Sequence, residues 1–318
     1  MALSTRITRL LGIRHPIIQG GLNYCGSAGL SAAVANAGGL GLLTALTQPS
    51  ASALREEIAS ARAMLAPDCP GALGVNLTIL PTVDAATRKE LVAAIVDERV
   101  DIVETSGSPP GDLILELKRH DVRVIHKCVT TRGARCAEEW GVDAISLDGF
   151  ECAGQPGAED LGNWLLQAMG ARELSVPFVT SGGVGDGRQL AAALALGASG
   201  VTMGTRFMAT EEASIHAGIK QALVDGAVGG VVGGAALATR PDGSPNDPRP
   251  HGVRLSVWSC GPVMALIDDV PTCAQLVERM VAEAVEVIEA LPASVDRHPA
   301  DAGVARLAQL ARKEGRAD

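Results

Sequence analysis

Two glycine turns in the middle of the chain have the composition of a phosphate-binding site. Ser181-Gly182-Gly183 follows a short apolar run at 177–180, and Met203-Gly204-Thr205 follows the next such run. Glycine at these turns lets backbone N–H groups approach an anion without a Cβ in the way. In a barrel of alternating strands and helices, the loops after the seventh and eighth strands commonly hold a phosphate. The two turns therefore predict a phosphorylated ligand or cofactor at the top of a barrel.

The elements that would position these turns recur along the chain as short apolar runs separated by helical patterns. Strand-then-helix alternation on this scale predicts a parallel sheet, and eight units close into an α/β fold, the (β/α)8 or TIM barrel. A doubly wound open sheet is less favoured because eight units would make it very wide and no GxGxxG motif follows the first strand. The predicted strands are 15–19, 40–45, 72–78, 102–105, 123–128, 144–147, 177–180 and 200–202.

Helix ends and a change of composition refine this plan. Ser27 is predicted to cap a helix at 28–37, and Asp186 is predicted to cap the helix that lies between the two glycine turns. After about residue 217 the pattern changes to glycine-rich and proline-rich stretches followed by an amphipathic helix. We expect a barrel over 1–217 and, over 218–318, a cap segment with C-terminal helices on the barrel mouth.

Composition argues against several classes of protein. The chain has 318 residues and a net charge of −9, whereas a nucleic-acid partner would need a basic stripe. No apolar run reaches the roughly 18 residues that cross a bilayer, and residues 1–16 lack the apolar core of an export signal. The seven cysteines show no CxxC pair and no zinc spacing, so we expect free thiols and no metal. These features favour a cytoplasmic protein with a small-molecule substrate, and a homo-oligomer stays open.

The predicted strand ends, taken in order, resemble the FMN-dependent nitronate monooxygenases. Relatives of that family include NADH:quinone reductases and flavin-dependent enoyl-thioester reductases, and the wording of VIHKC and DGFECAG is nearest to the quinone reductase branch. The segment VWSCG followed by LIDD, at 257–269, extends the resemblance into the cap. The matching stretches are HPIIQGG (15–21), ANAGGLG (35–41), GVNLT (74–78), VIHKC (124–128), DGFECAGQPG (148–157), SGGVGDGR (181–188) and MGTRF (203–207).

The resemblance implies an FMN molecule lying across the carboxyl ends of the strands. Lys127 would lie near the pyrimidine end of its ring, where a positive charge stabilises the reduced anion, and Asn76 would hydrogen-bond the polar edge. As plainer alternatives, Lys127 could pair with a carboxylate and Asn76 could be a turn residue. The other implied contacts are close backbone approaches, by Gly20, Gly21 and Leu22 to the ring, by Ala153 and Gly154 to the ring or ribityl chain, and by Ser181, Gly182, Gly183, Gly204 and Thr205 to the phosphate.

Gln155 stands where the family pattern has a histidine that serves as a base or hydrogen-bond donor beside the flavin. A glutamine amide donates and accepts hydrogen bonds but takes up no proton near neutral pH. General-base catalysis contributes typically about 10²–10⁴-fold, so nitronates, which are already anions, are expected to outrank neutral nitroalkanes as substrates. Gln155 and Lys127 are the predicted catalytic residues.

Other side chains are weaker candidates for proton transfer. His126 directly precedes Lys127, so strand alternation should turn His126 toward the helices if Lys127 faces the flavin. His15 should lie at the bottom of the barrel, and His251 in the cap is the first candidate for a replacement base. Cys152 lies in the predicted loop of Gln155, but a lone thiol is weak evidence for a nucleophile.

The resemblance therefore implies, as the predicted function, FMN-dependent oxidation of alkyl nitronates with O₂. NAD(P)H:quinone reduction is the alternative, with NADH or NADPH docking transiently over the flavin because there is no second GxGxxG motif. Enoyl-thioester or enone reduction ranks lower because Gln155 cannot protonate the α-carbon, and an FMN-binding protein without turnover stays open. A flavin-free aldolase or epimerase would need a Schiff-base lysine or paired acids, for which Lys127, Glu104 and Asp148 are nearest.

Overall fold

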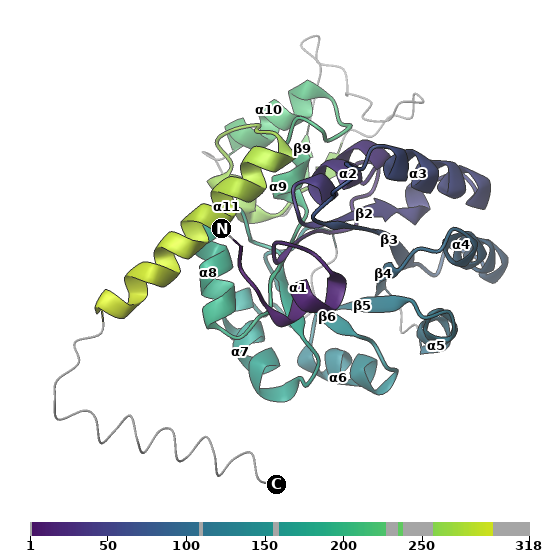
Figure 1. Cartoon of the computed structure of the whole chain (residues 1–318), viewed down its shortest axis with the longest axis horizontal. Coiled ribbons are helices and arrows are strands. Elements are labelled where there is room, and N and C mark those ends of the chain that lie inside the picture. The colour runs from purple at the N-terminus through teal and green to yellow at the C-terminus, as the bar shows by residue number, and fades with distance from the viewer. Residues whose placement is uncertain (1, 108–110, 155–158, 227–234, 238–256, 295–318) are drawn as a thin grey trace, which may run out of the picture.

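Eight parallel strands close into a barrel in the order in which they occur along the chain, and helices surround the barrel (Figure 1). This TIM barrel confirms the predicted fold. The structure is a computed structural model, and it describes residues 2–107, 111–154, 159–226, 235–237 and 257–294. The strands of the barrel are β1 (Ile17–Gln19), β2 (Leu40–Thr44), β3 (Ala72–Ile79), β4 (Ile102–Gly107), β5 (Arg123–Cys128), β6 (Ala144–Asp148), β7 (Phe178–Ser181) and β8 (Val201–Met203).

Helices follow the strands and form the outer layer. The largest displacement of any predicted strand end from its observed position is two residues. The helices are α1 (Arg6–Leu11), α2 (Ala28–Asn36), α3 (Ala51–Ala63), α4 (Ala85–Asp97), α5 (Gly111–Arg119), α6 (Thr131–Glu139), α7 (Asn163–Glu173), α8 (Gly187–Ala195), α9 (Thr205–Met208), α10 (Ala217–Asp225) and α11 (Cys273–Ala290), with short 3₁₀ turns at Ala45–Thr47, Pro262–Leu266 and Leu291–Ser294.

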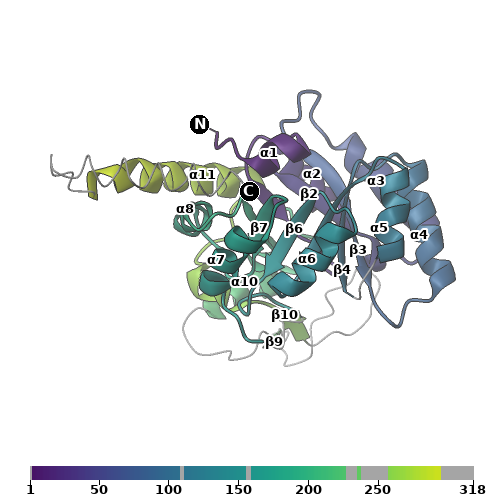
Figure 2. The ribbon, with the colours of Figure 1, turned by 90° about the horizontal axis from the view of Figure 1, so that it is seen from below.

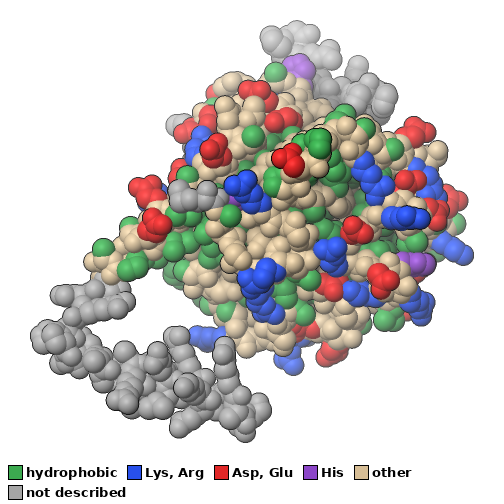
Figure 3. Space-filling view, in the orientation of Figure 1, with side chains coloured by type: hydrophobic (Ala, Val, Ile, Leu, Met, Phe, Trp, Pro, Cys, Tyr) green, Lys and Arg blue, Asp and Glu red, His purple; other side chains and the backbone are tan. Residues whose placement is uncertain are grey.

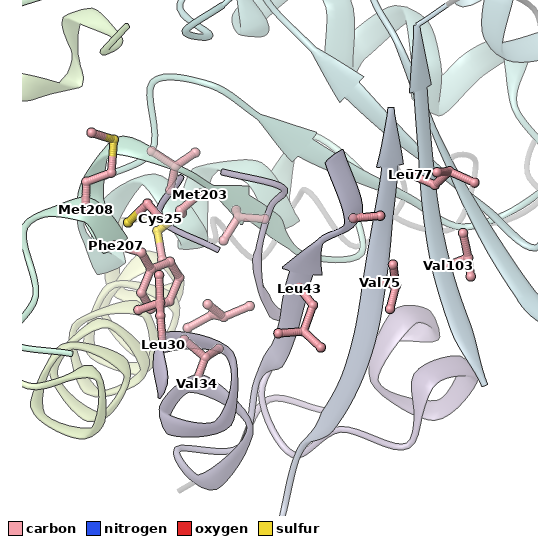
Figure 4. Close-up of a cluster of buried hydrophobic side chains, with 14 of the residues drawn as sticks. Cys25, Leu30, Val34, Leu43, Val75, Leu77, Val103, Met203, Phe207 and Met208 are labelled. Atoms are coloured by element: carbon pink, nitrogen blue, oxygen red, sulfur yellow. The ribbon is translucent and has the colours of Figure 1, made fainter. Parts of the chain in front are cut away.

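Side-chain alternation along the strands separates the barrel interior from the layer beneath the helices. Leu43 and Val75 belong to the outer cluster, together with Leu30 and Val34 of α2 (Figure 4). The lower half of the interior is a separate aliphatic cluster. Its strand residues are Ile18, Leu40, Leu42, Ile102, Ile125, Ala144 and Val179.

Helix α1 closes the bottom of the barrel, and the sequence reasoning did not include it. Ile7 and Leu11 of α1 pack onto the interior aliphatic cluster. The helix begins with a capping box, in which the Thr5 hydroxyl accepts from the Thr8 N–H and the Thr8 hydroxyl accepts from the Thr5 N–H. Charged side chains of both signs spread over this face of the molecule (Figure 3), in keeping with a structural barrel end.

The two predicted helix caps have different outcomes. The Asp186 carboxylate accepts from the Gln189 N–H at 2.9 Å, so the predicted cap of α8 is confirmed. Ser27 precedes α2 but its side chain makes no capping bond, so that prediction is wrong in its chemistry. The Glu57 carboxylate from α3 accepts from the Ala28 N–H at 2.5 Å instead. A distant side chain therefore satisfies the helix end that a local one was expected to satisfy.

The C-terminal part of the described chain contributes to both the ring and the mouth. Helix α11 packs against α8 and α2, and so occupies the gap between them in the outer layer (Figure 1). The antiparallel pair β9 (Ala235–Leu237) and β10 (Val257–Ser259) lies at the end of the barrel opposite α1 (Figure 2). The division of the chain at residue 217 stays a prediction.

Candidate functional site

A hollow of about 560 Å³, counted to its open mouth, lies at the carboxyl ends of the strands. Ten of the predicted site residues line it, while the predicted Gln155 falls outside the described residues. A second hollow, of about 740 Å³, lies at the amino ends of β3 and β4 and contains none of the predicted site residues. The first hollow is lined by Gly20, Gly21, Leu22, Lys127, Glu151, Cys152, Ala153, Ser181, Gly182, Gly183, Val184, Thr202, Met203, Gly204, Thr205, Met208, Ser259 and Val263.

The first glycine turn is held in place by its neighbours in a left-handed conformation. Gly182 and Gly183 have φ angles of +89° and +72°, which residues with a side chain rarely adopt. A Cβ on Gly182 would lie 2.5 Å from the backbone nitrogen of Cys152, so the loop after β6 also excludes a side chain. The Asn163 amide donates to the carbonyls of Ser181 and Gly182 at 3.1 and 2.6 Å. The N–H groups of Gly182 and Gly183 meet no acceptor in the described part of the chain, which leaves them free for an anion.

The second turn carries hydroxyl groups as well as backbone donors. The Thr205 hydroxyl accepts from the Gly261 N–H at 3.0 Å, which ties the C-terminal segment to the end of β8. Thr202 lines the hollow, and its buried hydroxyl has no hydrogen-bond partner among the described residues. Glu151 also lines the hollow, but its carboxylate accepts from the Asn163 N–H at the start of α7. The turn pair therefore offers donors to an anion, and the carboxylate of Glu151 beside it is held by the start of α7.

Four polar side chains lie above the aliphatic interior, at the carboxyl ends of β3 to β6, and of these four only Lys127 lines the hollow. We refer to the four as the floor of the site. Lys127 of β5 contacts Asp148 of β6 at 3.2 Å between Nζ and Oδ2, and their side chains are 20 % and 12 % exposed. Asn76 of β3 donates from Nδ2 to Oε2 of Glu104 on β4 at 2.7 Å. Glu104 is fully buried, and its Oε1 has no partner in the described chain. These residues come from four consecutive strands, so barrel closure alone brings them together.

The charges on this floor influence one another strongly. Burial lowers the pKa of Lys127, but the attraction of Asp148 and Glu104 outweighs it and raises that pKa above its usual value. Lys127 is therefore a permanent cation facing the hollow. Burial raises the pKa of Glu104, and Asp148 raises it further, while Lys127 opposes both effects. Glu104 is thus a carboxyl that holds its proton more tightly than an exposed one.

The structure gives a different reason for glycine at the two positions after β1 from the one that the sequence suggested. A Cβ on Gly21 would lie 2.1 Å from Cγ of Asn76, and a Cβ on Gly20 would lie 2.8 Å from the Thr202 methyl carbon. Neighbouring side chains, as well as any ligand, therefore require glycine at both positions. Asn76 itself lies against Gly21 rather than in the wall of the hollow.

The other candidate groups lie where they can do little acid–base chemistry in the hollow. His126 faces outward, as predicted, with Nδ1 2.8 Å from the Thr105 hydroxyl and its ring edge-on to Trp140. Burial lowers the pKa of His126 to about 4, so the ring is neutral at pH 7. Burial and the nearby Asp148 raise the pKa of Cys152 to about 11, so this residue is a thiol and not a thiolate. His251 lies outside the described residues.

Glu104 and Thr202 were not among the residues predicted for the cofactor site. Glu104 stands two residues after the interior residue Ile102, so strand alternation already placed its side chain inside the barrel. Thr202 stands two residues before Gly204 and opposite Ser181 in the barrel register. Both residues could have been found from strand alternation, which turns their side chains into the barrel near a strand end. The glycine motifs do not contain this information.

An eight-stranded barrel with free backbone donors and a buried lysine at the carboxyl ends of its strands has the architecture of a TIM-barrel enzyme, whose active site lies at that end of the barrel. The sequence profile of the nitronate monooxygenase family matches residues 4–89 and 72–232. The chain belongs to this family, and it is a flavin-dependent oxidoreductase that acts on small molecules.

Curated relatives and solved structures agree with this family. The chain is 34 % identical to (3aS,4S,5R,7aS)-5-hydroxy-7a-methyl-1-oxo-octahydro-1H-indene-4-carboxyl-CoA dehydrogenase of Mycobacterium tuberculosis, over 77 % of this chain and 66 % of that protein, so the match spans slightly under two thirds of its length. It is 29 % identical to the dehydrogenase of the same name from Rhodococcus jostii, over 92 % and 98 % of the two chains. It is 32 % identical to nitronate monooxygenase of Paraburkholderia phytofirmans, over 73 % of each chain. The structure of FabK from Thermotoga maritima superimposes with a TM-score of 0.79 at 27 % identity, covering 92 % of this chain and 100 % of FabK.

Two kinds of feature are absent from the residues that the structure describes. None of their helices combines the length and apolar character that crossing a membrane requires. In the same residues, no group of three or more histidine, cysteine or acidic side chains is arranged to hold a metal ion.

Proposed function

We propose that this chain binds FMN in the hollow at the barrel mouth and oxidises alkyl nitronates with O₂. The observation that carries the proposal is the permanent cation Lys127 in a hollow whose other wall is a pair of turns with free backbone donors. FMN supplies an electron acceptor when bound. The backbone donors of Gly182, Gly183, Gly204 and Thr205 would hold its phosphate.

The residues in and around the hollow fit such a cofactor by several independent features. The hydroxyl of the lining residue Thr202 and Oε1 of Glu104, which accepts from the lining residue Gly21 through its other oxygen, are buried polar atoms without partners in the described chain. Such atoms are uncommon unless a ligand satisfies them. The Gly182 and Gly183 N–H groups likewise lack acceptors there. Lys127 would keep a positive charge beside the ring and so favour its reduced, anionic form.

The choice of a nitronate follows from the acid–base groups. The described walls of the hollow contain no histidine, and the thiol of Cys152, with a pKa of about 11, holds its proton at pH 7. An alkyl nitronate arrives already deprotonated, so its oxidation needs no base. Lys127 would attract its negative charge, and Gln155 would offer an amide to its oxygens.

Steady-state kinetics test this proposal. We expect wild-type protein to turn over the nitronate of nitroethane with O₂ and to turn over neutral nitroethane at least about tenfold more slowly, because the neutral form needs a base. Gln155→His should raise kcat/KM for nitroethane by up to about 10²-fold, with a new titration between pH 6 and 9. Equal rates for nitroethane and its nitronate in the wild type would point to another base, and His251→Ala would then be the next variant. A protein that binds no FMN would refute the proposal.

A second candidate is oxidation or reduction of a CoA thioester. It is favoured by one observation: two curated relatives, at 34 % and 29 % identity, are named as carboxyl-CoA dehydrogenases. Anaerobic mixing of the flavin-loaded protein with a hydroxyacyl-CoA, with NADH, with NADPH and with a nitronate separates the candidates. Only the true electron donor bleaches the flavin at a rate that matches turnover.

A further inference from the structure

Glu104 has an unusual hydrogen-bonding pattern for a buried carboxyl group. Its Oε2 accepts two bonds, from Asn76 Nδ2 at 2.7 Å and from the Gly21 N–H at 3.2 Å. Its Oε1 is buried and has no partner among the described residues. Buried polar atoms almost always have a partner, so Oε1 is placed to bond a ligand atom, either as an acceptor or, once protonated, as a donor.

Glu104 also stands at the end of a chain of polar side chains that fixes Asn76. Ser106 donates to the Thr78 hydroxyl at 2.9 Å, and Thr78 donates to Asn76 Oδ1 at 3.1 Å. Asn76 in turn donates to Glu104. Its amide is therefore held from both sides, with one orientation of its oxygen and nitrogen. Since Gly21 donates to the same oxygen, Glu104 ties the loop after β1 to strands β3 and β4.

The charges around Glu104 allow it to gain or lose one proton. The titratable groups that face it are Lys127 from β5 and Asp148 from β6, while β3 and the loop after β1 contribute neutral donors. With Glu104 ionised, two carboxylates surround one lysine and the floor carries a net charge of −1. With Glu104 protonated, the floor is neutral. A proton on Oε1 leaves Oε2 free to accept from Asn76 and Gly21, so the polar chain persists in both states.

We propose that Glu104 is a positioning residue that holds Asn76 and Gly21 in place through Oε2 and takes up one proton from solvent on Oε1 when the anionic flavin binds. The proposal rests on the proposed function for the identity of the ligand. The proton uptake would make the floor of the site neutral when the cofactor binds, because an ionised Glu104 would repel the phosphorylated cofactor.

Flavin affinity across pH tests both parts of the proposal. The dissociation constant of FMN is measured by fluorescence titration of flavin-free protein from pH 5 to 9 for wild type, Glu104→Gln and Glu104→Ala. Glu90→Gln, an exposed site on α4, is the control. At pH 8 we expect Glu104→Gln to bind FMN about tenfold more tightly than wild type, with the two converging toward pH 5, because the amide cannot ionise. If the ratio of the FMN dissociation constants of wild type and Glu104→Gln is constant over pH, the proposed proton uptake is refuted.

Glu104→Ala tests the positioning role separately. The truncated side chain leaves Asn76 and Gly21 without their acceptor, so FMN should bind about tenfold more weakly than to Glu104→Gln at every pH. Equal affinity of these two variants would show that Glu104 positions nothing. Circular dichroism of each variant checks that the barrel is folded.

A flavin-free measurement distinguishes failure of this inference from failure of the proposed function. The side-chain carboxyl ¹³C resonance of Glu104, assigned by its loss in Glu104→Gln, should titrate above the ordinary glutamate value in apo-protein. Titration at or below that value would refute the proton-holding role even if FMN binds. Conversely, a wild type that binds no FMN at any pH refutes the proposed function while this titration still decides the state of Glu104.

Discussion

Removal of the Lys127 charge should expose how strongly the floor of the barrel depends on it. The Lys127–Asp148 contact is 3.2 Å long and both side chains are mostly buried, at 20 % and 12 % exposure. At an effective dielectric constant of about 20, Coulomb's law gives about 5 kcal/mol of attraction, which is an upper bound on the loss. Removing one partner of a buried pair typically costs about 3–5 kcal/mol because an uncompensated charge stays behind. Because this pair is partly exposed, we expect Lys127→Met to lower the free energy of unfolding by about 3 kcal/mol.

A double-mutant cycle in flavin-free protein measures this interaction directly. Urea unfolding at pH 7 gives the stabilities of wild type, Lys127→Met, Asp148→Asn and the double variant. Asp148→Asn should cost less than Lys127→Met, about 2 kcal/mol, because Lys127 still faces Glu104. The double variant should cost about 3 kcal/mol, so the coupling energy is about 2 kcal/mol. Additive effects of the two single changes would refute the reasoning that the pair carries the electrostatics of the site.

Three further outcomes are expected. Gly183→Asp, which adds a side chain at φ +72° and only 2.9 Å from Glu151 Cβ, should abolish FMN binding, and a yellow variant with wild-type FMN content would contradict the phosphate assignment. Because the pKa of Cys152 is raised to about 11, its alkylation by iodoacetamide should speed up about tenfold per pH unit from pH 7 to 10, and a rate that levels off near pH 9 would show an ordinary thiol. Because the pKa of Glu104 is raised in the folded state, its contribution to stability is largest below pH 4.5 and is lost as the pH rises through its folded-state pKa. The free energy of unfolding, measured by chemical denaturation from pH 4.5 to 8, should therefore depend less on pH for Glu104→Gln than for wild type.

The positions of the strands could be predicted from the sequence because buried parallel strands are continuous apolar runs, which are recognisable without any knowledge of their neighbours. Strand alternation also placed His126 and Lys127 on opposite sides of β5, as the structure shows. Helix α1 was missed because its start depends on two threonines that cap one another, a weaker signal than the usual acidic partner.

The sequence by itself determined which residues stand at strand ends and which turns lack side chains. Only the tertiary structure decided what those residues meet. Gly21 is required by the Asn76 side chain, and the α2 end is satisfied by Glu57 of α3. The same holds for charge: Lys127 pairs with Asp148 and faces Glu104 because barrel closure aligns the ends of β4, β5 and β6. Local propensity acts over a few residues, whereas these contacts join residues about 20 or more positions apart, so no local pattern in the chain contains them.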